Sequence, residues 1–155
     1  MKIRKARKKD VFEISMLISK TFEKFCSDDG TKEGVKRYID LHNPKKNLEN
    51  IQKSYYKSPI FFIAVQNNKI MGVIRGNSSK IGNLFVKEEY HKKGIAKKLI
   101  SRFEKEAKKN NSKEIKICAS LYAIPFYQKM GYKKTTGIKN FHGLKIFLMK
   151  KKFNI

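Results

Sequence analysis

One loop of the sequence combines small residues with positive charge in a way that suits an anionic ligand. It reads His91-Lys92-Lys93-Gly94-Ile95-Ala96, and a helical pattern begins at its end. Gly94 and Ala96 carry no bulk, so a ligand can approach the backbone where that helix starts. The unpaired N–H groups of a first helical turn attract anions, and the neighbouring lysines add to that attraction. The loop therefore predicts a binding site for a pyrophosphate group.

The loop matches neither of the two best-known phosphate loops. A Walker loop needs two glycines five positions apart followed by Lys-Ser/Thr, and a dinucleotide loop needs Gly-x-Gly-x-x-Gly. An ordinary strand-to-helix connection with one small residue for tight packing explains this loop equally well. Its spacing alone leaves both interpretations open.

Metal and disulfide chemistry have little support in the sequence. Three scattered His residues, two Cys residues (Cys26 and Cys118) and no cluster of carboxylates predict no metal site. The longest apolar run, Ile60–Val65, is six residues, whereas a membrane helix needs about 20. No apolar segment follows the basic N-terminus, so we expect no signal peptide, no membrane association and a cytoplasmic location.

The elements that position the loop fall into two halves. The first half predicts a strand at Ile3–Arg7 and a helix that Asp10 caps, with its apolar residues spaced three and four apart up to Phe25. A turn at Ser27–Gly30 and a second helix starting at Thr31 follow. Asn43-Pro44 ends that helix, and a third is expected around Leu48–Tyr55.

The second half changes to strand patterns and back. We expect strands at Ile60–Val65, Ile70–Arg75 and Lys80–Val86, a helix over 94–110, and a strand at Glu114–Cys118. A short helix at Ala123–Met130 ends at Gly131, and strands at Tyr132–Thr135 and Leu144–Lys151 close the chain. A strand, helix and strand in succession form a crossover with a parallel pair. The fold class is α+β, with a mixed, mostly antiparallel sheet and helices on both faces.

The charge of +24 comes from 37 Lys and Arg residues against 13 Asp and Glu residues. Such an excess favours polyanionic partners, nucleic acid among them. Only five of the 37 are Arg, the residue that reads bases and holds phosphates in bidentate pairs, so nucleic acid is an unlikely partner. A genome rich in A and T would also raise the Lys content without any function. The charge alone identifies no partner.

Two motifs, in order and at a fitting distance, resemble the GNAT superfamily of N-acetyltransferases. That family's hallmark is Gln/Arg-x-x-Gly-x-Gly/Ala between a strand and a helix, and 91–96 matches it at both small positions, with His first. Residues 123–132 resemble the second signature, Ala-x-x-Phe-Tyr-x-Lys-x-Gly-Phe/Tyr. The resemblance covers essentially the whole chain. It implies a single GNAT domain over 1–155 with a V-shaped splay between its central parallel strands.

The resemblance implies acetyl-coenzyme A as the co-substrate. Backbone groups of strand 84–86 would pair with the pantetheine arm, and one N–H would stabilise the developing oxyanion. Loop 91–96 would hold the pyrophosphate, and Lys129 would approach the adenosine phosphates. The implied cofactor-binding residues are Leu84, Phe85, Val86, His91, Lys92, Lys93, Gly94, Ile95, Ala96, Lys97, Ser120, Ala123, Phe126 and Lys129.

The same resemblance makes Tyr127 the general acid. An acceptor amine would attack the thioester directly, and Tyr127 would give a proton to the leaving thiolate of coenzyme A. A phenol with a pKa of about 10 can serve a thiol whose pKa is about 8.5. The alternative for Tyr127 is a packed aromatic ring with its hydroxyl bonded to backbone.

Neither the general base nor the acceptor amine can be identified. Asn83, on the central strand, cannot act as a base, and Glu88 and Glu89 lie beyond the end of that strand. The acceptor could be a small-molecule amine or a protein amine. Residues that could line its pocket are Asp28, Asp29, Glu33, Cys118 and His142.

Two other functions compete with acetyl transfer. A non-catalytic module that binds or senses acyl-coenzyme A is favoured by His91 in place of Gln/Arg, while Tyr127 argues against it. A basic nucleic-acid-binding domain is the weaker alternative. The sequence does not distinguish a monomer from a homodimer.

Overall fold

Apolar periodicity determines the helices, as α1 (Val11–Cys26) shows. Ile14, Ile18 and Phe22 lie on one face of α1 and are buried, while the opposite face is exposed. The computed structural model describes residues 1–154. In this part of the chain the other helices are α2 (Lys32–Leu41), α3 (Pro44–Tyr56), α4 (Ile95–Lys109) and α5 (Ile124–Lys129), with 3-10 turns η1 (Lys8–Asp10), η2 (Glu88–Tyr90) and η3 (Leu121–Ala123).

The strands form one mixed sheet in the order β1-β2-β3-β4-β5-β8-β6, and β7 also pairs with β8. Every pair is antiparallel except β4 with β5, which confirms the α+β class and the single crossover. The strands are β1 (Lys2–Lys5), β2 (Ile60–Gln66), β3 (Lys69–Asn77), β4 (Lys80–Val86), β5 (Glu114–Ser120), β6 (Lys133–Lys134), β7 (Lys139–Phe141) and β8 (Leu144–Lys152).

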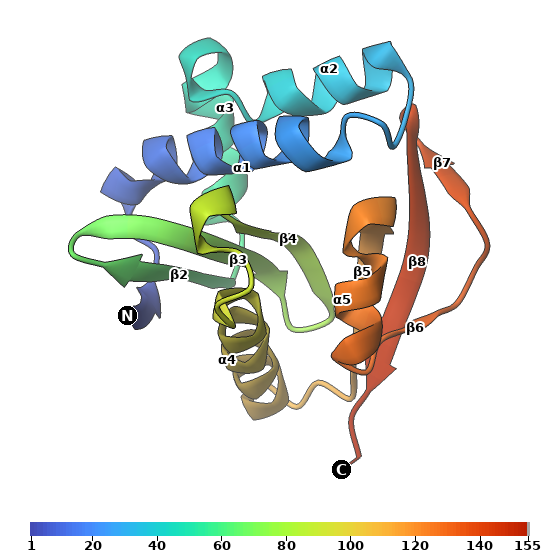
Figure 1. Cartoon of the computed structure of the whole chain (residues 1–155). Coiled ribbons are helices and arrows are strands. Elements are labelled where there is room, and N and C mark those ends of the chain that lie inside the picture. Colours follow the sequence, from blue (N-terminus) through green and yellow to red (C-terminus); the bar gives the residue numbers. More distant parts are fainter. Residues whose placement is uncertain (155) are drawn as a thin grey trace.

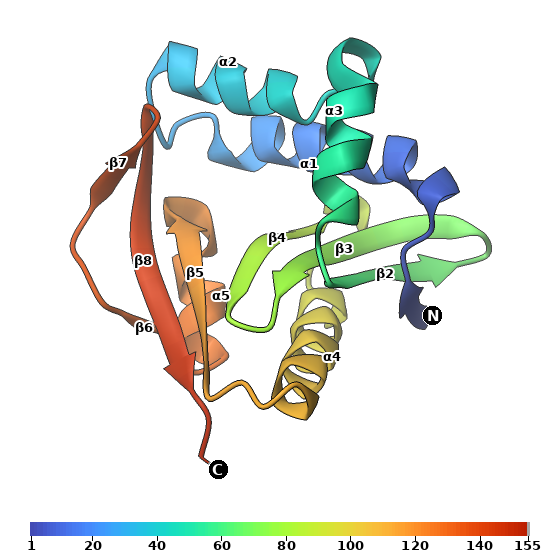
Figure 2. The same cartoon turned by 180° about the vertical axis from the view of Figure 1, so that it is seen from behind.

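The helices cover the sheet on both faces, as Figures 1 and 2 show. Helices α1 and α3 pack on one face of β2 and β3, where Ile63 and Val73 are fully buried. Helix α4 covers the other face through Leu99, Ile100 and Phe103, which are all inaccessible to solvent. Burial of a large apolar side chain contributes roughly 1.5–3 kcal/mol, so these two cores hold β4 firmly between them.

Expectations at the ends of several elements are wrong in detail. The third helix begins at Pro44 instead of Leu48, because Asn43 caps it and proline suits its first position, and the strand expected at Tyr132–Thr135 is only Lys133–Lys134. The first strand stops at Lys5 instead of Arg7, because Arg7 is the residue that precedes the 3-10 turn η1. Asp10 precedes α1 but does not cap it: its Oδ2 accepts the Arg7 N–H at 2.7 Å and the Arg4 guanidinium at 2.8 Å. Strand β7 was not expected, because its three residues are all exposed and show no alternation.

Three glycines join the loop after α1 to the turn between β7 and β8. The Thr31 N–H donates to the Gly143 carbonyl oxygen at 2.8 Å, and Gly30 forms an isolated bridge with Leu144. A Cβ on Gly34 would lie 2.7 Å from the backbone carbon of Gly143, closer than real Cβ atoms come. Only glycine permits this contact, which places the start of α2 against the start of β8.

We expect Gly34→Ala to lower the free energy of unfolding by roughly 1–3 kcal/mol, because the added Cβ meets backbone that cannot move aside. Helix propensity alone predicts the opposite, a gain of about 1 kcal/mol. Urea denaturation distinguishes the two. Gly137→Ala is the matched control, since a Cβ there meets nothing within 4 Å and the change should stay within about 0.5 kcal/mol. A Gly34→Ala protein as stable as the wild type would disprove this packing.

Candidate functional site

The central parallel strands separate soon after they meet. Strands β4 and β5 pair only at Lys80 with Lys116 and at Ile81 with Ile117. From Asn83 onward β4 has a partner on one side only, the side of β3. This is the V-shaped splay that the resemblance predicted, and Figures 1 and 2 show the two halves of the sheet diverging.

The separation leaves backbone groups of β4 without a strand partner. The Lys87 N–H donates to the Met71 carbonyl oxygen of β3 at 2.9 Å. Backbone groups point alternately to the two sides of a strand. The N–H and C=O groups of Phe85 therefore also point to β3, whereas those of Leu84 and Val86 point to the opening. The Val86 carbonyl oxygen is bonded to His91 Nε2 at 2.6 Å. The opening therefore presents the N–H groups of Leu84 and Val86.

A cavity of about 770 Å³ occupies this opening and passes through the sheet. Its wall includes Leu84 and Val86, whose side chains point to the face that α4 covers. It also includes Phe85 and Cys118, whose side chains point to the face that α1 and α2 cover. Since successive residues of a strand point to opposite faces, a wall containing both sets must extend through the gap between β4 and β5. The volume lies within the range of ligand-binding pockets, about 300–1,000 Å³.

The N-terminus of α4 forms one end of the cavity. Gly94, the residue before the helix, has a φ of +77°, a left-handed conformation that favours glycine. The first helical bond of this turn joins the Lys98 N–H to the Gly94 carbonyl oxygen, so the N–H groups of residues 95–97 have no helical acceptor. Nothing lies within 4 Å of where a Gly94 Cβ would be. Free donors and free space coincide there, as an anion site requires.

Cationic side chains line the cavity. Lys92, Lys97 and Lys129 lie in the cavity wall, and none of them takes part in an ion pair within residues 1–154. Lys93 lies outside the wall, with its Nζ 5.8 Å from the centre of the Tyr90 ring. The other residues implied as cofactor-binding all line the cavity: Leu84, Phe85, Val86, His91, Lys92, Gly94, Ile95, Ala96, Lys97, Ser120, Ala123, Phe126 and Lys129.

Tyr127 reaches the cavity from α5 with its hydroxyl unoccupied. The side chain is buried, and its ring packs edge-on against Tyr132 with the centroids 5.6 Å apart. The Tyr132 hydroxyl donates to Glu104 at 2.9 Å, whereas no hydrogen bond within residues 1–154 uses the Tyr127 hydroxyl. Every fully buried side-chain oxygen in that range has a hydrogen-bond partner. Since the Tyr127 oxygen has none, it is not fully buried and is open to the cavity. Burial raises the pKa of Tyr127 above its ordinary value, which keeps the phenol protonated.

A polar network supports the other face of the opening. Asn83 Oδ1 accepts from Arg75 Nε at 2.9 Å, and Asn83 Nδ2 donates to the Tyr38 hydroxyl at 3.0 Å. Arg75 lies 4.3 Å from the centre of the Tyr55 ring and pairs with no carboxylate within residues 1–154. Tyr38 and Asn83 both line the cavity. The network therefore places a largely buried positive charge directly behind the wall.

His42 belongs to the same network and is uncharged at neutral pH. Its Nδ1 shares a hydrogen bond of 2.7 Å with the Tyr55 hydroxyl, and its ring lies against Tyr38. Burial, with a smaller effect from Arg75, lowers the pKa of His42 to about 4. A second positive charge is thereby avoided next to Arg75.

We call the part of the cavity on the face of the sheet that α1 and α2 cover the α1–α2 chamber. Sequence reasoning missed its aromatic residues, because Phe22, Phe25 and Tyr38 belong to the apolar stripes of helices and look like ordinary core. Of the acceptor-side candidates, Asp29 and Cys118 line the cavity, whereas Asp28, Glu33 and His142 do not. The wall of the α1–α2 chamber consists of Phe22, Phe25, Cys26, Asp29, Tyr38 and Leu144.

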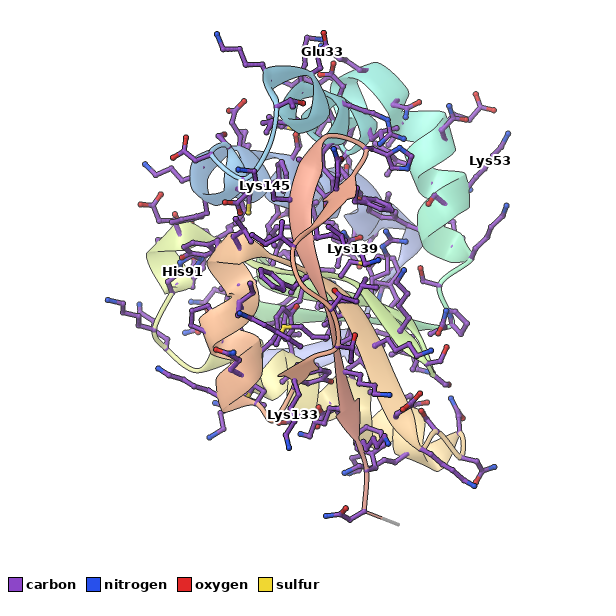
Figure 3. The ribbon with its side chains drawn as sticks, turned by 90° about the vertical axis from the view of Figure 1, so that its right-hand side faces the viewer. Glu33, Lys53, His91, Lys133, Lys139 and Lys145 are labelled. Carbon is purple, nitrogen blue, oxygen red and sulfur yellow. The ribbon has the colours of Figure 1, made fainter. Side chains whose placement is uncertain are left out.

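Figure 3 shows the molecule from the side of β8. Lys145 lies at the end of β8 that meets the loop after α1, where its N–H donates to the Asp29 carbonyl oxygen at 2.6 Å. His91 lies on the side of α5, and its ring centroid is 4.9 Å from that of Phe25. The loop before α4 and the end of α1 thus meet at the mouth of the cavity.

Neither a metal group nor a membrane helix is found in residues 1–154. No three His, Cys, Asp or Glu side chains there are grouped so that they could hold a metal ion. No helix in that range is long and apolar enough to cross a membrane.

The chain resembles known acetyltransferases over nearly its whole length. A family model described as an acetyltransferase (GNAT) domain matches residues 26–153. Among solved structures, a GCN5-related N-acetyltransferase from Rhodopseudomonas palustris matches with a TM-score of 0.83 and 17% identity, covering 98% of this chain and 95% of that one.

Two similar structures contain coenzyme A. The PaiA N-acetyltransferase from Thermoplasma acidophilum, in complex with coenzyme A, has a TM-score of 0.75 and 23% identity, with 98% of each chain covered. An aminoglycoside 6'-N-acetyltransferase complexed with coenzyme A has a TM-score of 0.74 and 18% identity, over 98% of this chain and 97% of that one. At these identities the likeness establishes the fold.

The two cysteines should differ in reactivity. Cys26 is 3% exposed, and burial raises the pKa of its thiol to about 11, so little thiolate exists at pH 8. Both cysteines line the cavity, but Cys118 is only partly buried and is therefore easier for a reagent to reach. We expect iodoacetamide at pH 8 to alkylate Cys118 at least about tenfold faster than Cys26, as followed by peptide mass spectrometry. In guanidinium chloride both should react alike, and equal rates in the folded protein would contradict the different burial of the two thiols.

Proposed function

Since the chain belongs to the GNAT acetyltransferase family, we propose that it transfers an acetyl group from acetyl-coenzyme A to a primary amine. One observation carries the proposal. A single cavity through the β4–β5 opening joins the free N–H groups of α4 to the unoccupied hydroxyl of Tyr127. The N–H groups of α4 could hold the phosphates of a thioester, and its reacting carbonyl could lie near the Tyr127 hydroxyl.

The residues present fit acetyl-coenzyme A. The N–H groups of residues 95–97 and the cations Lys92, Lys97 and Lys129 suit its phosphates. The N–H groups of Leu84 and Val86 suit the amide carbonyls of its pantetheine arm, which would add to β4 as an extra strand. Phe126 and Ala123 supply apolar surface on the opposite wall.

The backbone of β4 would also assist the reaction. An amine that attacks the thioester carbonyl turns its oxygen into an oxyanion, which needs a donor already in place. The N–H groups of Leu84 and Val86 are fixed by the sheet and point into the opening, so the one that is not paired with the pantetheine arm can donate to the oxyanion without rearrangement. The attacking nitrogen gives a proton to water as the N–C bond forms. When the tetrahedral intermediate then collapses, the C–S bond breaks and the thiolate requires a proton.

We assign the delivery of that proton to Tyr127. Its hydroxyl is accessible from the cavity and has no competing hydrogen bond within residues 1–154. The amine would approach from the α1–α2 chamber, because the cavity crosses the sheet and the α4 side is taken by the cofactor. The acceptor is thus either a small-molecule amine or an exposed amine of a protein.

One feature favours the alternative of a non-catalytic acyl-coenzyme A module. His91, at the position of the family's Gln/Arg, uses Nε2 to hold the Val86 carbonyl oxygen, so that nitrogen is not free for a phosphate. Loss of one phosphate contact weakens binding but does not remove Tyr127. Acetyl transfer therefore remains the better-supported function.

Gly94→Glu should abolish acetyl-coenzyme A binding. The substitution puts bulk and negative charge next to the free N–H groups at the start of α4, where the pyrophosphate would lie. We therefore expect an affinity loss of more than about 100-fold. Isothermal titration calorimetry measures it. Gly137→Glu adds the same charge in the β6–β7 connection and should bind like the wild type. Equal binding by the Gly94→Glu protein would place the phosphates elsewhere.

Tyr127→Phe should lower kcat by about 10²–10⁴-fold and leave the Kd for acetyl-coenzyme A nearly unchanged, because only a proton donor is lost. Steady-state thiol release and calorimetry measure the two quantities.

Tyr132→Phe is the matched control for this variant. It removes the hydroxyl that binds Glu104 and should lower Tm, with little effect on kcat. If Tyr127→Phe reduces binding and turnover together, Tyr127 is structural. An unchanged kcat would assign the proton to another group.

A further inference from the structure

The α1–α2 chamber contains a single carboxylate. Asp29 is the only acidic residue in the wall of the whole cavity, within the described residues 1–154. It is held in place from two sides: its carbonyl oxygen accepts the Lys145 N–H at 2.6 Å, and its Oδ2 accepts the Tyr122 N–H at 3.4 Å. A carboxylate has about four acceptor sites, so Asp29 can still bind a ligand's ammonium group.

Aromatic rings occupy the surface around this carboxylate. Phe25 and Tyr122 stack with their centroids 4.9 Å apart, and Phe22 stacks on Tyr38 at 3.9 Å. Tyr122 lines the cavity and is 52% exposed. Aromatic faces attract an ammonium ion and also bury an apolar body, so a single ammonium attached to an apolar group suits both features.

Positive charge limits how many ammonium groups the chamber can accept. Arg75 lies behind Asn83 without a carboxylate partner in residues 1–154, and Lys145 adjoins Asp29. The chain as a whole carries +24. A polyamine or aminoglycoside would bring further ammonium groups into a space with one carboxylate, and each would face uncompensated repulsion.

We infer that the acceptor is an apolar primary monoamine, of the kind represented by 2-phenylethylamine, and that Asp29 binds its ammonium group. This group gives one proton to water before the neutral nitrogen attacks the thioester. The inference rests on the proposed function and adds the class of substrate. Phe22, Phe25 and Tyr38 contact the apolar body, and Asp29 determines the specificity for an amine. Leu144 closes the chamber on the β8 side.

The test measures thiol release from acetyl-coenzyme A with 2-phenylethylamine, spermidine or kanamycin as acceptor. The wild-type protein should use 2-phenylethylamine with the highest kcat/KM. Asp29→Asn should raise the KM for 2-phenylethylamine at least about tenfold, with a smaller change in kcat and no change in acetyl-coenzyme A binding. Asparagine keeps an oxygen for the Tyr122 N–H, and thermal unfolding checks that the variant is folded.

Asp28→Asn is the matched control, because it removes the same charge one residue away on an exposed side chain outside the cavity wall. It should leave the KM unchanged, whereas equal effects of the two variants would overturn the role of Asp29. Better use of spermidine or kanamycin, or no thiol release with 2-phenylethylamine, would overturn the substrate class. A wild-type protein that fails to bind acetyl-coenzyme A would instead overturn the proposed function, and the inference with it.

Discussion

The early separation of two parallel strands is the constraint on which the rest of the site depends. Strands β4 and β5 share only two residue pairs, after which β4 relies on β3 and β5 relies on β8. A buried backbone N–H without a partner costs free energy, so the groups of Leu84 and Val86 favour a ligand that can pair with them. Because parallel strands end at the same edge, the turns that follow β4 and β5 flank one opening. The free N–H groups at the start of α4 and Tyr127 of α5 are therefore brought to one cavity by the topology.

Each half of the sheet has enough strand pairs of its own to keep β4 and β5 separated at the opening. Strand β5 makes seven residue pairs with β8, and β4 makes six with β3. The bond of Asn83 to Tyr38 ties β4 to α2, and the contact of Gly34 with Gly143 ties α2 to the start of β8. These links join the two halves through the helices, in addition to the two residue pairs between β4 and β5. A cavity can therefore pass between the strands without loss of the fold.

The sequence carries enough periodicity to predict the elements and their order, and the two motifs point to the cofactor side. Strand β4 lies at its predicted bounds, Lys80–Val86, because a buried strand between two turns leaves a strong local pattern. The acceptor side has no such pattern. Phe22 and Tyr38 occupy ordinary core positions of their helices, and only tertiary packing turns one edge of each ring toward a cavity. Asp29 and Asp28 look alike in the sequence, and the bonds from Tyr122 and Lys145 distinguish them.

Amide hydrogen exchange of β4, followed residue by residue by NMR, tests most directly whether the opening receives the pantetheine arm. On saturation with acetyl-coenzyme A, exchange at Leu84 and Val86 should slow at least about tenfold, because their N–H groups gain acceptors. Phe85, which already faces β3, should change little. Slowing confined to other parts of the chain, or none in β4 when acetyl-coenzyme A is bound, would contradict the account.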